Sequence, residues 1–151
     1  MPALLDVNAL IALIDSDHVG HPAMSRWFRR HHRRGWATCP LTENSTVRVL
    51  SQASYPSGAR TPSEVVEVLS ALKAAFGQSY EFWPDDLSLS NSALFDPTLI
   101  AGPRQVTDAY LLGLASHHKA TLVSFDRSLP WHAIRGGSAN LIHLPSERVN
   151  P

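Results

Sequence analysis

The stretch Ala3-Leu4-Leu5-Asp6-Val7-Asn8-Ala9-Leu10-Ile11-Ala12-Leu13 sets the pattern for the whole chain. Its first three apolar residues predict a short β-strand that ends at Asp6. A helix is predicted to follow through Asp15, and Asn8 is suited to cap it because a side-chain oxygen can accept a bond from a free backbone N–H group. Apolar residues recur on one face of this helix, at Leu10, Leu13 and Ile14. The stretch therefore predicts a strand that passes into an amphipathic helix at an acidic residue.

The rest of the chain repeats this alternation of short strands and helices. Further strands are predicted at Trp36–Cys39, Tyr80–Trp83, Thr121–Phe125 and Leu141–Leu144. Helices are predicted from Pro22 to Gly35, and at Leu41–Gln52, Thr61–Phe76, Pro84–Leu94 and Gln105–His118, with loops at Ser54–Arg60 and Phe95–Arg104. Helices between strands indicate βαβ units. We therefore expect an α/β fold with a central, mostly parallel sheet of about five strands.

The composition is that of one folded domain without a membrane segment. A length of 151 residues is close to the commonest domain size, and 44% hydrophobic residues is typical of globular proteins. The single cysteine, Cys39, excludes an internal disulfide and a zinc site built on several thiolates. The longest apolar run, Ala9–Ile14, is too short to span a bilayer, and the N-terminus lacks the basic segment of a signal peptide. We expect a single domain over residues 1–151 in a soluble, cytoplasmic protein.

Four acidic residues stand at equivalent places in the predicted elements. Each follows a strand or lies in the first turn of a helix, and they are Asp6, Glu43, Asp108 and Asp126. In an open parallel sheet, strand C-termini and helix N-termini share one edge, where ligands bind. The four carboxylates are therefore expected to converge on one crevice. The simpler interpretation is that acids at helix N-termini only stabilise the helix dipole.

Converging carboxylates need either protons or a cation. Two of them about 5 Å apart repel by roughly 3 kcal/mol at an effective dielectric constant near 20. A helix N-terminus offsets only about 0.3–1 kcal/mol of this repulsion. An all-oxygen ligand set completed by water suits Mg²⁺ or Mn²⁺, which activate water and stabilise charge on a phosphodiester. The acids therefore indicate metal-dependent phosphoryl chemistry on a nucleic acid.

With these residues placed, the sequence resembles the PIN-domain ribonucleases and, among them, the VapC-type toxins of toxin–antitoxin modules. The resemblance covers most of the chain from Leu4 to His143 and rests on segments in a fixed order. These segments are Leu4–Leu13, Leu41–Asn44 continuing to Val47–Leu50, Val106–Ala115 and Thr121–Arg127. Each segment is common by itself, and the order of all of them is specific. The stretch Tyr80–Arg104 matches no family motif.

The resemblance implies roles for the polar residues in these segments. All four acids would form the catalytic site. Asp6 and Asp108 would be the surest metal ligands. Glu43 and Asp126 would complete the site as ligands, either directly or through water. Polar neighbours would orient the acids or hold the substrate, namely Asn8, Thr107 and Ser124.

The resemblance also implies a fold, an activity and partners. The fold would be a PIN-like three-layer α/β/α arrangement. The activity would be that of an endoribonuclease that uses Mg²⁺ or Mn²⁺ and leaves a 5′-phosphate on the cleaved RNA. The partners would be a second copy of the chain, in a homodimer, and a small VapB-like antitoxin that occludes the crevice.

A stripe of arginines on the second predicted helix is the main basic feature. The spacing i, i+3, i+4, i+7 and i+8 places them on one face, and they are Arg26, Arg29, Arg30, Arg33 and Arg34. The stripe could contact RNA phosphates, in which case binding would weaken steeply with salt. It could equally be a solvated face, or pair with acids of a partner subunit or antitoxin.

Other functions remain open at this point. An aspartyl-phosphate hydrolase also places Asp-x-Asn after a strand, but usually has a second Asp where this chain has Asn8. A metal-independent ribonuclease would use histidines as acid and base and leave 2′,3′-cyclic phosphate ends. A catalytically inactive PIN-like binding module would keep the fold without turnover, and the presence of all four acids argues against it.

Overall fold

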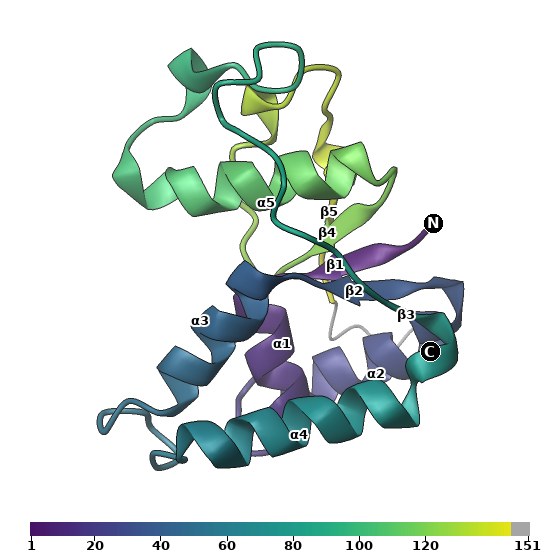
Figure 1. Ribbon diagram of the computed structural model, residues 1–151, viewed down its shortest axis with the longest axis vertical. Coiled ribbons are helices and arrows are strands. Elements are labelled where there is room, and N and C mark those ends of the chain that lie inside the picture. Colours follow the sequence, from purple (N-terminus) through teal and green to yellow (C-terminus); the bar gives the residue numbers. More distant parts are fainter. Residues whose placement is uncertain (146–151) are drawn as a thin grey trace, which may run out of the picture.

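A five-stranded parallel sheet lies at the centre of the protein in the computed structural model, which describes residues 1–145 (Figure 1). The strand order is β3-β2-β1-β4-β5, and every neighbouring pair is parallel. The strands are short: β1 (Ala3–Leu5), β2 (Trp36–Thr38), β3 (Tyr80–Phe82), β4 (Thr121–Val123) and β5 (Ile142–His143). The predicted α/β class and parallel sheet are therefore confirmed.

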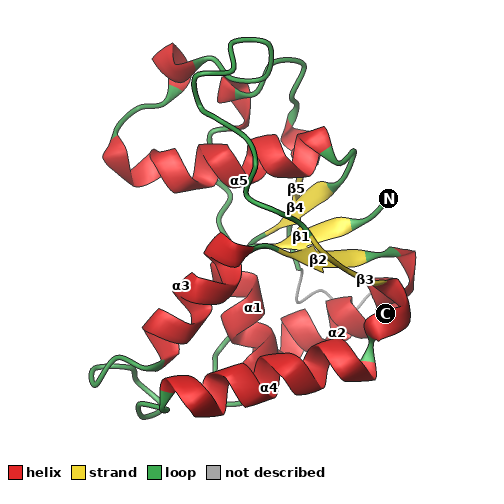
Figure 2. Cartoon of the chain, in the orientation of Figure 1, coloured by secondary structure: helices red, strands yellow, loops and turns green. Residues whose placement is uncertain are grey.

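Helices cover both faces of this sheet (Figure 2). They are α1 (Val7–Ile14), α2 (His21–His31), α3 (Pro40–Leu50), α4 (Pro62–Ala75) and α5 (Val106–His117). Figure 1 shows α1 to α4 on one side of the strands and α5 on the other. Within residues 1–145, no helix has both the length and the apolar character needed to cross a membrane.

Two apolar cores, one on each face, hold these layers together. Side chains alternate between the faces of a strand. Ala3 and Leu5 of β1 accordingly pack with residues of α1 to α4, whereas Leu4 packs with residues of α5. The expected three-layer α/β/α arrangement is thereby confirmed.

Helix α1 is capped by Asp6, so the expectation that Asn8 caps it was wrong. Asp6 has an extended backbone, and its Oδ1 accepts a bond from the Val7 N–H at 2.7 Å. Asn8 lies two residues after the N-cap, inside the first turn of the helix, and its amide bonds to the segment after β4. The acid at the end of β1 therefore starts the helix itself.

The predicted helix at Pro84–Leu94 is absent, and this segment runs as turns and extended chain across α5 (Figure 1). Tertiary contacts provide the reason. Trp83 is buried and its ring stacks on His118 with centroids 3.9 Å apart. The Asp85 carboxylate accepts hydrogen bonds from residues of α3 and α5, and the backbone of Asn91 closes a local turn. These contacts outweigh the helical tendency of the sequence.

Gly113 is the position where α5 tolerates no side chain. A Cβ there would overlap the ring of Phe95, which is fully buried against this helix. Alanine normally stabilises a helix by about 1 kcal/mol relative to glycine. We predict that Gly113→Ala instead lowers the free energy of unfolding by about 1–2 kcal/mol, because overpacking displaces Phe95.

Urea unfolding followed by circular dichroism would measure this change. Gly77→Ala is the matched control, since nothing lies within 4 Å of a Cβ at Gly77. A Gly113→Ala protein as stable as the parent would show that Phe95 does not occupy this position.

Candidate active site

The ends of β1 and β4 lie side by side and form the base of the site. Leu5 pairs with Val123, and the Asp6 N–H donates to the Val123 carbonyl at 3.0 Å. From β1 the sheet extends through β2 and β3 in one direction and through β4 and β5 in the other. Such a reversal leaves a crevice at the strand C-termini, which is where open α/β sheets bind ligands. Asp6 and Asp126 follow the two strands that flank it.

Asn8 joins the two strand ends. Its Nδ2 donates to Ser124 Oγ at 3.0 Å, and its Oδ1 accepts from the Phe125 N–H at 3.1 Å. Ser124 is fully buried, and its Oγ also accepts from the Asp126 N–H at 3.1 Å. The polar residues Asn8 and Ser124 thus fix the backbone from which Asp6 and Asp126 project.

Asp6 is buried, with 6% of its surface exposed. Burial raises its pKa above the usual value, although hydrogen bonds from Ser124 and the Val7 N–H oppose this effect. The negative charge of Asp126 raises the pKa further. The carboxylate is therefore charged only at an energetic cost in the absence of a cation.

Asp108, in the first turn of α5, shares this electrostatic environment. Burial raises the pKa of Asp108 to about 6, and the charges of Asp6 and Asp126 contribute to the increase. Two acids can raise the pKa of a third only if they lie near it. The charges of Asp6 and Asp126 therefore act on Asp108, although the three residues come from separate parts of the chain.

Glu43, in the first turn of α3, bonds to groups on the β2–β3 side of the sheet. Its Oε1 accepts from the Thr38 hydroxyl at 2.6 Å and forms an ion pair with Lys73 Nζ at 2.5 Å. The Tyr80 hydroxyl donates to the same oxygen at 3.3 Å. Lys73 lies on α4, which packs beside α3. The spacing of residues along the sequence did not predict this ion pair, because only the fold brings the two helices together.

The carboxylate oxygens of these acids have the donor chemistry that suits a hard cation. Hydrogen bonds within residues 1–145 use Oδ1 of Asp6, Oδ1 of Asp126 and Oε1 of Glu43. The second oxygens of Asp126 and Glu43 have no such bond in the described part of the chain. Carboxylate oxygens are ligands that Mg²⁺ and Mn²⁺ prefer. However, no three His, Cys, Asp or Glu side chains among these residues form a ready-made ligand set.

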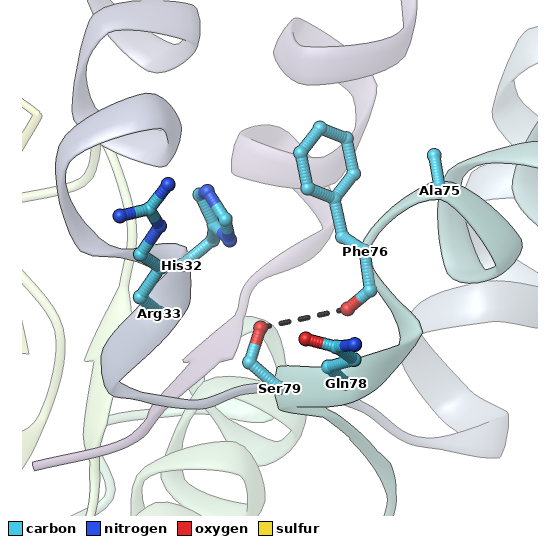
Figure 3. Close-up of a pocket in the computed structure, with 6 residues that line it drawn as sticks. All are labelled: His32, Arg33, Ala75, Phe76, Gln78 and Ser79. Atoms are coloured by element: carbon cyan, nitrogen blue, oxygen red, sulfur yellow. Dashed lines mark hydrogen bonds between the residues drawn. The ribbon is translucent and has the colours of Figure 1, made fainter.

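The other residues singled out from the sequence are more dispersed. Thr107 is exposed beside Asp108 at the start of α5. Most of the arginine stripe is exposed, and its last two members lie near the beginnings of the strands, away from the acids. Arg34 lines a small hollow with Ala3 and Thr121. Arg33 borders another, of about 570 Å³, with His32, Phe76, Gln78 and Ser79 (Figure 3).

Comparisons with known proteins identify the family of this chain and agree with its fold. The family model described as PIN domain matches residues 3–133. Ribonuclease VapC44 of Mycobacterium tuberculosis is 42% identical over 139 residues, which are 91% of this chain and 95% of that protein. Ribonuclease VapC38 of the same organism is 45% identical over 82% of this chain and 84% of its own length. The crystal structure of VapBC2 from Rickettsia felis, bound to a promoter DNA fragment, covers 95% of this chain and 98% of its own with a TM-score of 0.62 at 10% identity.

The raised pKa of Asp108 predicts a pH-dependent effect of its replacement. The folded chain holds this proton more tightly than the unfolded chain, so stability is lost as pH rises through about 6. Asp108→Asn removes the charge. We predict that it adds about 1 kcal/mol to the free energy of unfolding at pH 7.5, after allowance for solvent screening of a half-buried group, and almost nothing at pH 3.5.

Urea unfolding in a chelating buffer at both pH values would measure this difference. Glu67→Gln, at an exposed position on α4, is the control for loss of a charge. An equal gain at both pH values would contradict the electrostatic origin of the effect.

Proposed function

Because the chain belongs to the PIN-domain family and, within it, to the VapC group, we propose that it is a metal-dependent endoribonuclease and the toxin of a type II toxin–antitoxin module. The position of Asp6 and Asp126 after the two strands at the reversal point of the sheet, together with the pKa of Asp108 that their charges raise, supports it best. Relatives at 42% and 45% identity carry the name ribonuclease. The donor chemistry and the family thus favour the same activity.

The proposed cofactor is Mg²⁺ or Mn²⁺. Asp6, Asp108 and Asp126 would hold it with their oxygens, and water would fill the remaining positions. When bound, such an ion activates water and stabilises negative charge on the phosphodiester. The divalent charge would also relieve the repulsion that raises the pKa values of Asp6 and Asp108.

The protein's own residues would position the acids and the RNA. Asn8 and Ser124 hold the ends of β1 and β4 in register, so Asp6 and Asp126 keep a fixed separation. Glu43 would join the site through its free Oε2, while Lys73 holds its Oε1. We expect cleavage to leave a 5′-phosphate. Contacts of the arginine stripe with RNA stay a prediction, and Arg33 and Arg34 would reach phosphates remote from the cut.

The proposed partners follow from the family. A VapB-like antitoxin would cover the acidic crevice, and a second copy of the chain would form a homodimer. The likeness to VapBC2 of Rickettsia felis over 95% of this chain supports a fold suited to such assemblies. RNA is the proposed substrate.

Aspartyl-phosphate hydrolysis is less well supported by the site. Such enzymes use a lysine against the phosphate, and Lys73 is paired with Glu43. The amide of Asn8 is also engaged, with Ser124 and Phe125. An inactive binding module would need no convergence of three buried or half-buried acids, whose repulsion costs stability.

Replacement of Asp6 tests the proposed activity directly. We predict that Asp6→Asn lowers RNA cleavage with Mn²⁺ by about 100-fold or more, because a neutral amide is a poor ligand for a hard cation. The fold should persist, since Asn Oδ1 can still accept the Val7 N–H bond. Cleavage of total bacterial RNA, with sequencing of the new 5′ ends, would measure activity and locate the cut.

Glu67→Gln is the control on the exposed face of α4, and it should cleave like the parent. Circular dichroism would confirm that both variants are folded. An Asp6→Asn protein that cuts RNA at the parental rate would refute the assigned site, and parental cleavage in the presence of a chelator would refute metal dependence.

The pairing of Lys73 with Glu43 predicts a change in metal affinity. Loss of this cation adds one uncompensated negative charge near the site. We therefore expect Lys73→Met to strengthen Mn²⁺ binding by about 1 kcal/mol, or roughly fivefold. Electron paramagnetic resonance of free Mn²⁺ would measure this. Lys119→Met, at the other end of α5 from Asp108, should have no effect, and equal affinities of the two variants would contradict the prediction.

A further inference from the structure

Asp85 connects the two helices that carry Glu43 and Asp108. Its Oδ2 accepts from the Leu41 N–H at 2.9 Å, and its Oδ1 accepts from the Tyr110 hydroxyl at 3.0 Å. Leu41 precedes Glu43 by two residues on α3, and Tyr110 follows Asp108 by two residues on α5. One carboxylate thus bonds to a backbone N–H in the first turn of α3 and to a side chain in the second turn of α5.

The start of α3 needs such an outside partner. The first residues of a helix leave backbone N–H groups without intrahelical acceptors. Here the N-cap is Cys39, whose sulfur is a weak acceptor, and the first helical residue is Pro40, which has no N–H. Leu41 therefore presents the first N–H that requires a strong acceptor, and Asp85 supplies it from a segment 44 residues further along the chain.

The bond to Tyr110 makes this cap a link between layers. Side chains two residues apart on a helix point in nearly opposite directions. Tyr110 can therefore bond outward to Asp85 while Asp108 faces Asp6 and Asp126. Burial and the Asp85 carboxylate raise the pKa of Tyr110, so the phenol keeps its proton and remains a donor.

We propose that Asp85 is a positioning residue that sets the distance between Glu43 and Asp108 by clamping the starts of α3 and α5. This inference rests on the proposed function, because the distance between Glu43 and Asp108 matters only if both acids act in that site. Residues that orient metal-binding groups typically change affinity or activity by about 10–100-fold when they are replaced. Asp85 itself is exposed and does not contribute to the raised pKa of Asp6 or Asp108.

Four variants separate this role from metal ligation and from general stability. Asp85→Ala removes both bonds, and Tyr110→Phe removes one. Asp85→Asn keeps the bridge, because its Oδ1 can accept the Leu41 N–H and its Nδ2 can donate to the Tyr110 oxygen. Asp86→Ala is the matched control: it removes an exposed neighbouring acid that makes no side-chain hydrogen bond within residues 1–145.

Cleavage kinetics would use a synthetic oligoribonucleotide that spans the most frequently cut site, with Mn²⁺. We expect Asp85→Ala to lower kcat by about tenfold with KM changed by less than about twofold, because the reacting geometry and not RNA binding is lost. Tyr110→Phe should show a smaller loss of kcat. Asp85→Asn and Asp86→Ala should stay within about twofold of the parent.

Amide hydrogen exchange at Leu41, followed by NMR without metal or RNA, reports on the bridge independently of activity. Exchange should be faster in Asp85→Ala and unchanged in Asp85→Asn and Asp86→Ala. Parental kcat or parental Leu41 exchange in Asp85→Ala would overturn the proposal, and so would equal damage in Asp85→Asn, which would indicate a charge-based role. If the parent itself cleaves no RNA, the proposed function fails, and Leu41 exchange still decides whether Asp85 clamps the helices.

Discussion

The pairing of β1 with β4 is the constraint on which the rest of the structure depends. All three residues of β1 are buried, and the strand lies between β2 and β4 in the middle of the sheet. A parallel pair fixes both strand ends at one edge. Asn8 then ties those ends together through Ser124 and the Phe125 N–H. Asp6 and Asp126 owe their proximity to backbone pairing and not to any attraction between them.

The energetic cost of placing like charges near one another must be offset by stabilising contacts elsewhere in the fold. Burial and the charges of neighbouring acids raise the pKa values of Asp6 and Asp108, so these carboxylates oppose folding near neutral pH. Hydrophobic contacts on both faces of the sheet outweigh that cost. Glu43 differs because Lys73 already balances its charge. Burial therefore opposes the charge of Asp6 and Asp108, whereas Lys73 neutralises that of Glu43.

The sequence was sufficient for the features that arise from local patterns. Apolar runs predicted the five strands, which the structure confirms. That the acids after strands and in the first turns of helices form one site stays a prediction, supported by the influence of Asp6 and Asp126 on the pKa of Asp108. Local patterns failed where distant parts of the chain compete for the same groups. The pattern of residues 84–94 predicted a helix, but the burial of Trp83 and the two bonds of Asp85 hold the segment as turns and extended chain. Lys73 reaches Glu43 only because α4 packs beside α3, and no spacing along the chain encodes that contact.

Residues 84–94 are anchored at both ends, so relatives can differ in the middle of this segment. One end is fixed by Trp83 on His118, and the other by Phe95 against α5 and by backbone bonds to residues 133 and 135. Between the anchors, the side chains of Ser88 and Ser90 bond only to each other and to nearby backbone within the described chain. Exposed loops of this kind accept insertions and deletions readily. The part of this span beyond Asp85 can therefore change in length and composition over evolution, while the bonds of Asp85 and the acidic edge are kept.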